Sequence, residues 1–349
     1  MNLTESLLYW YSNNKRNLPW RETQNPYQIW LSEIILQQTQ IKQGLPYYES
    51  FVKHFPTVFD LAKAEEDTVL KHWQGLGYYS RARNLHYTAK YVVDNFNGKF
   101  PNSYKDLINL KGIGDYTASA ISSICFDEKC AVVDGNVYRF LSRYFGVETP
   151  INTSKGIKEF KLLAQSLLPN KNIGEYNQAI MEFGSRQCSP GLPECSKCPL
   201  NNSCFALQHK TVNSLPVKIK KTNIKKRFFN YVVLVTKDQR TLLIKRKGKG
   251  IWQNLYQFPL IESPDTWSMR QIVKSSKFNS IIQQSSFEIN LFNELEIVHK
   301  LSHQHLYTRF WIVTVNQLLE KGISVSEIEK FPVPTLISNF IDSFNFSHQ

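Results

Sequence analysis

Four cysteines lie close together between Cys188 and Cys204, with Cys195 and Cys198 between them. Their spacing is Cys-x6-Cys-x2-Cys-x5-Cys, and the whole chain has only 6 cysteines. Because a [4Fe–4S] cluster is held by four cysteine thiolates, this spacing is typical of a loop that wraps one cluster. Prolines and a glycine within the loop favour the turns that it needs. The chain must therefore fold so that four side chains of one short segment converge.

Two other roles for these cysteines stay open. A structural zinc site usually combines two Cys-x2-Cys pairs across a longer loop, and only Cys195 and Cys198 form such a pair here. A disulfide pairing is the second alternative. The remaining Cys125 and Cys130 sit in an apolar stretch and are expected to be buried thiols. Free thiols together with a cluster indicate a reducing compartment, which in a bacterium is the cytoplasm.

Composition narrows the class of protein. The chain has 349 residues, 42% of them hydrophobic, which predicts two domains. No apolar run approaches the roughly 18 residues of a membrane span, and residues 1–15 do not resemble a signal peptide. A formal net charge of +13 favours a polyanionic partner, because Lys and Arg that neutralise phosphates release counterions. A basic surface without a nucleic-acid role remains the alternative.

The sequence pattern changes along the chain. Residues 1–208 show helical periodicity interrupted by Gly and Pro, which predicts an all-α domain. Residues 209–227 read as a basic linker, and residues 228–349 as an α+β domain. In this last part we expect strands at 231–236, 241–246, 295–299 and 309–315, and a helix at 334–344.

A short motif with two glycines predicts a hairpin between helices. It reads Leu110-Lys-Gly112-Ile-Gly114-Asp-Tyr116 and is flanked by apolar residues at helical spacing. Glycines let the backbone approach a phosphate, so that amide groups and the start of the next helix face the anion. A generic turn between helices is the alternative.

An aspartate precedes the next helical stretch. Asp134, in the run Val133-Asp-Gly-Asn-Val137, stands where a helix N-cap is expected, and that helix should run to about Tyr144. A capping carboxylate accepts backbone N–H bonds at the positive end of the helix dipole. We therefore expect a lowered pKa for Asp134 and a carboxylate that can stabilise a cation.

The hairpin, the aspartate and the four-cysteine loop, in this order, resemble the endonuclease III superfamily of base-excision DNA glycosylases. The runs at residues 18–21, 30–40 and 75–84 look like the adenine-specific branch, the MutY type. The resemblance implies that Glu33 protonates adenine, that Asp134 stabilises the resulting oxocarbenium ion, and that Tyr116 hydrogen-bonds Asp134. Apolar neighbours should raise the pKa of Glu33 toward ~6–7. Related thymine-glycol enzymes carry a nucleophilic lysine where this chain has Tyr116, so strand cleavage is not expected.

The resemblance also assigns binding residues. Those of the adenine pocket are Arg16, Leu18, Trp20 and Gln178. Arg21 and Trp30 are further substrate-binding candidates, and Arg21 and Asn136 are candidates for contacts near the sugar and phosphate. Those that contact DNA are Gln38, Thr39, Tyr78, Gly112, Gly114 and Asn136. Flipping adenine out of the duplex leaves a gap in the base stack, which Gln38, Thr39 and a Tyr78 wedge would fill. Arg186 and Lys197, beside the cysteines, are candidates for backbone contacts, with plain solvated charges as the alternative.

The C-terminal part resembles the Nudix-like domain that the family appends, notably at residues 250–259. Residues 263–280 lack the acidic cluster that a Nudix hydrolase needs for Mg²⁺, so pyrophosphatase activity is not expected. In the family a Phe-Ser-His segment inspects 8-oxoguanine; here it is Leu301-Ser302-His303. Together with Gln38, Thr39 and Tyr78, Ser302 and His303 are the expected recognition residues. A metal site in this His-rich run is the rival interpretation.

The sequence thus predicts a monofunctional adenine glycosylase that carries a [4Fe–4S] cluster. It should act as a monomer on double-stranded DNA with adenine opposite 8-oxoguanine or guanine, associated with the nucleoid if the source is bacterial. The alternatives are a thymine-glycol glycosylase with lyase activity, a catalytically silent DNA-binding scaffold and a nucleotide-pool hydrolase.

Overall fold

The computed structural model describes residues 2–219, 224–283, 285–317 and 322–346. It divides into two compact units. One, here called the helical unit, comprises Met1–Lys63 and Asn84–Lys220. The other, the sheet unit, comprises Ala64–Arg83 and Lys221–Gln349. None of the described helices is both long and apolar enough to span a membrane.

The helical unit confirms the all-α prediction for this part of the chain. Its helices are α1 (Leu3–Asn14), α2 (Pro26–Leu36), α3 (Ile41–His54), α4 (Val58–Lys63), α7 (Tyr104–Leu107), α8 (Asp115–Phe126), α9 (Gly135–Phe145), α10 (Ser154–Ser166), α11 (Ile173–Arg186) and α12 (Phe205–Gln208), with α6 (Ser80–Phe96) starting in the segment Ala64–Arg83. Short 3₁₀ turns lie at Pro19–Arg21, Cys195–Lys197 and Asn201–Ser203.

Helix α11 organises the core of this unit because it packs against α1, α8 and α9. Phe183 of α11 lies edge-on to Trp10 of α1 and to Phe140 of α9, with ring centroids 4.9 and 5.1 Å apart. Small residues let the helices approach closely: a Cβ at Gly184 of α11 would lie 2.5 Å from the Asn136 carbonyl oxygen of α9. The start of α9 therefore rests directly on α11.

The predicted hairpin joins α7 and α8. Gly112 has φ +82°, a left-handed conformation that favours glycine, and a Cβ there would meet Asn84 at 2.7 Å. Gly114 is the N-cap of α8, with an extended backbone. The next predicted helix also forms, since α9 runs from Gly135 to Phe145 behind its N-cap Asp134.

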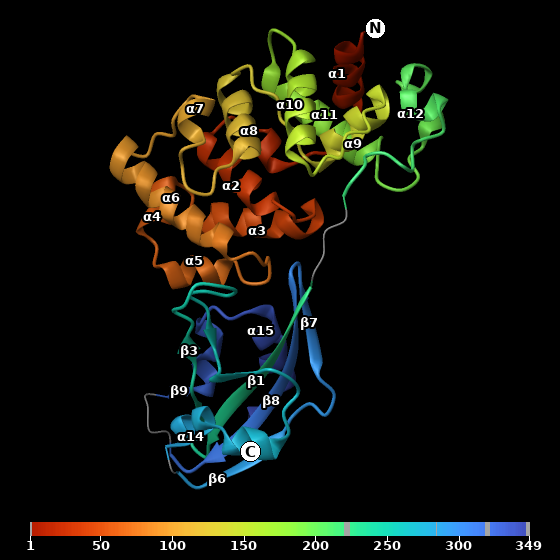
Figure 1. Ribbon diagram of the computed structural model, residues 1–349. Coiled ribbons are helices and arrows are strands. Elements are labelled where there is room, and N and C mark those ends of the chain that lie inside the picture. The colour runs from red at the N-terminus through yellow and green to blue at the C-terminus, as the bar shows by residue number, and fades with distance from the viewer. Residues whose placement is uncertain (1, 220–223, 284, 318–321, 347–349) are drawn as a thin grey trace. The chain divides into compact units, whose positions relative to one another are not determined.

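The sheet unit confirms the α+β prediction. Its main sheet has the order β5-β1-β8-β6, and β7 also pairs with β8. The strands are β1 (Lys225–Thr236), β5 (Leu260–Ser263), β6 (Phe287–Leu291), β7 (Ile297–Leu301) and β8 (Gln304–Val315). β1 and β8 run parallel, side by side over their whole length (Figure 1). The final helix α15 (Thr335–Ser343) forms as predicted.

Several expected boundaries differ in the structure. The strand predicted at 241–246 is two pieces, β2 (Arg240–Thr241) and β3 (Ile244–Lys245), because they pair with different partners, β9 (Ile323–Ser324) and β4 (Tyr256–Gln257). β5 and β6 were not predicted. The predicted linker overlaps β1, since the pairing of β1 with β8 begins at Lys225; residues 220–223 of the linker lie outside the described residues.

Residues 64–83, which the sequence pattern assigns to the helical domain, group with the C-terminal residues instead. They comprise α5 (Glu66–His72) and the loop that leads into α6. The remaining helices of the sheet unit are α13 (Met269–Lys274) and α14 (Ser276–Ile282), with a 3₁₀ helix at Val325–Lys330. The helices α13 and α14 contain no acidic residue, which agrees with the missing Nudix acid cluster.

Candidate active site and cysteine loop

One pocket of the helical unit brings together most of the predicted catalytic and adenine-binding residues. It is lined by Arg16, Leu18, Trp20, Arg21, Glu33, Leu36, Thr39, Gln40, Ile41, Lys42, Tyr116, Asp134, Asn136, Met181, Glu182 and Ser185. These side chains come from segments far apart in the sequence, mainly from the Pro19–Arg21 turn, α2, α8, the start of α9 and α11. The fold thus places two carboxylates, Glu33 and Asp134, in one cavity.

Glu33 lies on α2, among residues that are almost all buried, and its own exposed fraction is 8%. Burial raises the pKa of Glu33 to about 7, and the nearby charge of Asp134 adds to the increase. The Tyr116 hydroxyl and Arg21 act in the opposite direction. The expected elevation is therefore present, and a substantial fraction of Glu33 is protonated near neutral pH.

The hydrogen bonds of Tyr116 differ from the prediction. Its hydroxyl bonds the Glu33 carboxyl group and lies 3.4 Å from the Met181 sulfur, while Asp134 acts on it only through its charge. Burial, together with these two carboxylates, raises the pKa of Tyr116 well above its ordinary value, so the phenol stays a donor. Tyr116 lies on the first turn of α8, and from there it interacts with the carboxyl groups of both Glu33 and Asp134.

Asp134 caps α9 as predicted. Its Oδ1 accepts the amides of Asn136 and Val137 at 2.9 and 2.8 Å, and its Oδ2 accepts Asn136 Nδ2 at 2.7 Å. The predicted direction of its pKa is wrong, however. Burial raises the pKa of Asp134, and the three hydrogen bonds lower it by less. Desolvation outweighs capping because the carboxylate is enclosed in the pocket.

Glu182 is a pocket residue that the sequence analysis missed. Its side chain is 1% exposed, and it pairs with Arg16 at 2.5 Å and with Arg21 at 2.7 Å. Burial alone would raise the pKa of Glu182, but the hydrogen bonds from the two arginines outweigh burial and lower it to about 2. Glu182 fixes both guanidinium groups at the pocket wall. Its position one helical turn after Gln178 was the available signal.

Two of the predicted substrate-binding residues do not line this pocket. Trp30 is 1% exposed and packs in the core against Phe100, with ring centroids 5.1 Å apart. Gln178 accepts a hydrogen bond from the Tyr11 hydroxyl at 2.9 Å and lines a neighbouring hollow, whose wall includes Arg21. Both lie on helices, α2 and α11, but helical periodicity did not show which way each side chain points.

Several residues predicted to contact DNA lie outside this pocket. Gln38 follows α2 with φ +55°, and Gly112 and Gly114 form the hairpin turn. Arg186 donates to the Asn14 carbonyl, and Lys197 forms an exposed ion pair with Glu194 at 3.0 Å.

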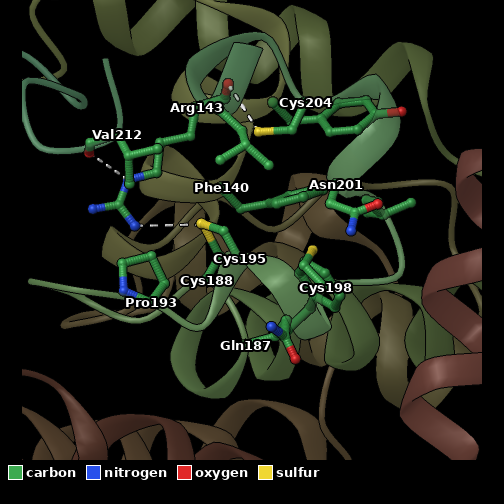
Figure 2. A pocket seen from close by; sticks show the side chains of 14 residues that line it. Phe140, Arg143, Gln187, Cys188, Pro193, Cys195, Cys198, Asn201, Cys204 and Val212 are labelled. Carbon is green, nitrogen blue, oxygen red and sulfur yellow. Dashed lines mark hydrogen bonds between the residues drawn. The ribbon is translucent and has the colours of Figure 1, made fainter. Parts of the chain in front are cut away.

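The four cysteines of the predicted loop line a single apolar pocket, shown in Figure 2. Cys188 follows α11. Cys195 begins the first 3₁₀ turn, Cys198 directly follows that turn, and Cys204 directly follows the second turn, before α12. Arg143 of α9 points into the same pocket: its Nη1 lies 3.5 Å from the Cys188 sulfur, and the Cys204 thiol lies 3.7 Å from its carbonyl oxygen. Burial raises the pKa of Cys188, while Arg143 and Arg139 lower it; burial also raises the pKa of Cys198 to about 11.

Within the described ranges, no three His, Cys, Asp or Glu side chains are grouped closely enough to hold one metal ion. What the pocket offers is four sulfurs that line a common space, with the Arg143 guanidinium beside them. The expectation for the other two thiols holds only in part: Cys125 and Cys130 are half-buried, although burial still raises the pKa of Cys125 to about 12.

Arg139 joins the cysteine loop to the capped aspartate. Its Nε donates to the Cys188 carbonyl at 2.7 Å, and its Nη2 donates to Asn136 Oδ1 at 2.9 Å. Asn136 in turn donates to Asp134. The Arg139 guanidinium also donates to the Gly184 carbonyl of α11, so it holds the start of α9, the end of α11 and the cysteine loop together.

The sheet unit has a separate hollow at the β7–β8 hairpin. Leu301 pairs with Gln304, so Ser302 and His303 form a two-residue turn. The Tyr78 hydroxyl lies 2.6 Å from Ser302 Oγ. The residues that line this hollow are Gly77, Tyr78, Tyr79, Ser80, Arg83, Gly250, Ile251, Trp252, Lys300, Leu301, Ser302, His303 and Gln304. Three of the residues predicted to inspect a base thus share one site.

Each half of the chain matches a known protein family. The model described as HhH-GPD superfamily base excision DNA repair protein matches residues 31–165, and the model described as NUDIX domain matches residues 230–343. A protein of Buchnera aphidicola subsp. Baizongia pistaciae named adenine DNA glycosylase is 36% identical over 358 residues, covering 99% of this chain and 98% of that protein. A human protein of the same name is 41% identical over 212 residues, covering 58% of this chain and 39% of the human protein.

Among solved structures, one described as a thermostable thymine-DNA glycosylase matches with a TM-score of 0.55 and 29% identity. The match covers 59% of this chain and 95% of that chain. This share is close to the extent of the helical unit.

Proposed function

Because the chain belongs to the adenine DNA glycosylase family, which hydrolyses N-glycosidic bonds, we propose that its substrate is adenine opposite 8-oxoguanine, or opposite guanine, in duplex DNA. The base is released and the strand is left intact. The observation that carries this proposal is the pocket in which Glu33, with a pKa of about 7, lies with Asp134.

The chemistry follows from what two differently placed carboxyl groups can do. Neutral adenine is a poor leaving group, so an acid must protonate it, and Glu33 is an acid with the right pKa for neutral pH. Departure of the base leaves positive charge on the sugar, and the Asp134 carboxylate is the matching anion. At ~4 Å and an effective dielectric constant of ~20 this attraction is about 4 kcal/mol, or roughly three decades in rate.

The remaining pocket residues orient these groups. Tyr116 donates to Glu33, and Asn136 with the α9 amides holds Asp134. Arg16 and Arg21, fixed by Glu182, border the space where the base would lie. Tyr116 also stands at the position of the lysine nucleophile of lyase enzymes. We therefore expect abasic sites and no β-elimination.

The cysteine pocket suits a [4Fe–4S] cluster. Its donors are four sulfurs, and Arg143 and Arg139 supply positive charge that favours thiolates. Cys188, Cys195, Cys198 and Cys204 would hold the cluster, which would fix the loop between α11 and α12 and supply no catalytic step. Purified protein should contain about four iron and four sulfide per chain; zinc in equimolar amount instead would overturn this assignment.

The sheet unit would inspect the base opposite adenine. Ser302 and His303 supply hydrogen-bonding groups at the hairpin, Tyr78 supplies a half-exposed ring, and Leu301 gives a smaller apolar contact than the phenylalanine of the family. In the helical unit, Gln38 and Thr39 would fill the gap in the stack. DNA binding as a monomer is part of the same proposal.

Single-turnover incubation with four labelled duplexes tests this function. The duplexes hold adenine opposite 8-oxoguanine, guanine or thymine, or thymine glycol, and each is analysed with and without alkali. Alkali-dependent breaks at adenine opposite 8-oxoguanine are expected. Alkali-independent breaks at thymine glycol would instead indicate a lyase, no cleavage a scaffold, and Mg²⁺-dependent cleavage of 8-oxo-dGTP a nucleotide-pool hydrolase.

A further inference from the structure

The segment Ala64–Arg83 is bound to the C-terminal residues of the sheet unit at several points along its length. At its start, Asp67 of α5 accepts Lys245 Nζ at 2.6 Å and the Tyr256 hydroxyl at 3.0 Å. The neighbouring Glu66 accepts Asn254 Nδ2 at 2.6 Å. Helix α5 is therefore anchored by its acidic first turn to β3, β4 and the loop before β4.

A second anchor lies just before the glycine-rich loop. Gln74 Nε2 donates to Ser338 Oγ at 3.3 Å, and Gln74 Oε1 accepts the Val333 amide at 3.2 Å. The Tyr79 hydroxyl donates to the Val333 carbonyl at 3.4 Å, and Arg83 donates to the Gln253 carbonyl at 2.9 Å. The loop that carries Tyr78 is thus held on both sides.

Tyr78 itself occupies a costly conformation at the centre of this loop. Its φ is +46°, which is uncommon for a residue other than glycine, and its side chain is 47% exposed. The Arg81 guanidinium lies 5.5 Å from the centre of its ring, and its hydroxyl meets Ser302. A residue keeps such a conformation only where its surroundings hold it.

We propose that Asp67 and Gln74 are positioning residues that hold the Tyr78 ring against the hairpin turn at Ser302 and His303. These anchors set how strongly the enzyme prefers 8-oxoguanine over guanine opposite adenine. The inference rests on the proposed function, because it needs a base at this hollow. It assigns to Asp67 and Gln74 of Ala64–Arg83, a segment within the glycosylase match, a part in placing the Tyr78 ring.

The physical reason is that the Tyr78 ring can enter the base stack efficiently only when it is already held in place before DNA binds. Opening the stack costs a few kcal/mol, and a ring that must first be ordered repays less of that cost. The cost of ordering the Tyr78 ring is the same for both substrates, but only 8-oxoguanine offers added hydrogen bonds at the Ser302–His303 turn. When the ring is no longer held against this turn, we expect those hydrogen bonds to form less often, so the preference for 8-oxoguanine weakens. Adenine chemistry in the helical unit does not involve these anchors.

Asp67→Asn in the full chain tests the first anchor. It keeps the side-chain size and removes the charge that binds Lys245. The readout is the ratio of single-turnover adenine-excision rates, at subsaturating enzyme, for 8-oxoguanine and guanine duplexes. We expect this ratio to fall by about fivefold, in the range expected for loss of a partly exposed charge-assisted contact. Gln74→Ala should act in the same direction.

The charge swap Asp67→Lys with Lys245→Asp is the rescue, and it should recover at least half of the lost ratio. Glu327→Gln is the matched control, because Glu327 forms an exposed ion pair with Lys330 elsewhere in the sheet unit. Fluorescence of 2-aminopurine next to 8-oxoguanine reports wedge insertion directly. It should fall in Asp67→Asn and return in the swap, which a merely structural role would not produce.

The outcomes separate the two proposals. A wild-type enzyme that excises adenine opposite neither base overturns the proposed function, and the inference with it. A wild-type enzyme that excises both adenines at equal rates overturns the inference alone. A wild-type preference that survives unchanged in Asp67→Asn, with unchanged 2-aminopurine fluorescence, overturns the inference alone. If thermal unfolding shows that Asp67→Asn folds poorly, the charge-swap variant decides. A swap variant that is folded but still has a lowered ratio of excision rates for 8-oxoguanine and guanine duplexes also overturns the inference.

Discussion

At the scale of single residues, the pKa of Glu33 predicts a pH profile. Glu33 acts in its protonated form, whose fraction falls as pH rises through about 7. Asp134 acts as carboxylate, and burial raises its pKa, so it protonates at a higher pH than an ordinary aspartate. The single-turnover rate at saturating enzyme should therefore be bell-shaped and fall by about tenfold per pH unit on the alkaline side. A flat rate between pH 6 and 9 would contradict the role of Glu33.

Glu33→Gln should lose activity and gain stability. The rate should fall by ~10²–10⁴-fold, the usual contribution of a general acid, while duplex binding remains. The folded-state pKa of Glu33, about 7, lies above its ordinary value of 4.5, so the folded state loses stability as pH rises through this interval. The loss amounts to roughly 3 kcal/mol at pH 8, which the amide avoids. Thermal unfolding should show a higher Tm for the variant at pH 8 and no difference at pH 4.

Glu182→Gln should have the opposite effect on stability. The folded-state pKa of about 2 lies below the ordinary 4.5, so Glu182 stabilises the fold above pH 4.5, and this contribution is lost as pH falls toward 2. Removing its charge leaves Arg16 and Arg21 without their buried partner, and we expect about 3 kcal/mol of destabilisation at pH 7 in denaturant unfolding. Glu262→Gln removes the partly exposed partner of Arg227 and should cost under about 1 kcal/mol. Equal losses would contradict this assignment.

The residues of the pocket show what sequence reasoning can reach. The family resemblance implied roles for Glu33 and Asp134, which the structure brings into one pocket, and local spacing predicted the N-cap of α9. The pKa direction of Asp134 was wrong because it depends on enclosure by α2, α8 and α11, which spacing along one helix does not reveal. Tyr116 was assigned Asp134 as its hydrogen-bond partner, and Gln178 a place in the adenine pocket. Both depend on where side chains of several helices point, which spacing does not reveal either.

At the scale of elements, the crossing of α9 and α11 positions Asp134. A Cβ at Gly184 would lie 2.5 Å from the Asn136 carbonyl oxygen, so Gly184→Ala must push the start of α9 away from α11. Overpacking of this kind costs about 1–3 kcal/mol, and displacement of the capped aspartate should lower the excision rate by more than tenfold. Denaturant unfolding and single-turnover rates measure the two effects.

Gly135→Ala is the stability control on the same helix. A Cβ there meets nothing within 4 Å, and alanine suits the first turn of a helix better than glycine. Stability should be unchanged or rise by up to about 1 kcal/mol. If Gly184→Ala behaves in the same way, the α9–α11 contact does not constrain the site.

Elements were predictable where one periodicity dominates. The parallel pairing of β1 with β8 extends both strands beyond their apolar runs, so β1 begins among the lysines that look like linker. The segment Ala64–Arg83 has helical periodicity like its neighbours, and only its long-range hydrogen bonds group it with the sheet unit. The Asp67–Lys245 bond joins residues 178 positions apart, and the Gln74–Ser338 bond joins residues 264 positions apart. No local sequence pattern encodes contacts over such separations.

At the scale of the whole molecule, the net charge of +13 predicts how affinity depends on salt. If the basic surface contacts roughly six phosphates, log Kd should rise with log salt with a slope of about 5, because each neutralised phosphate releases counterions. The rate of the bound complex should not change with salt, since Glu33 and Asp134 lie inside the pocket. Fluorescence anisotropy between ~50 and ~300 mM salt, beside single-turnover rates at saturating enzyme, separates the two. A slope near zero would mean that the positive charge has no part in DNA binding, and affinity would then have to come from base contacts alone.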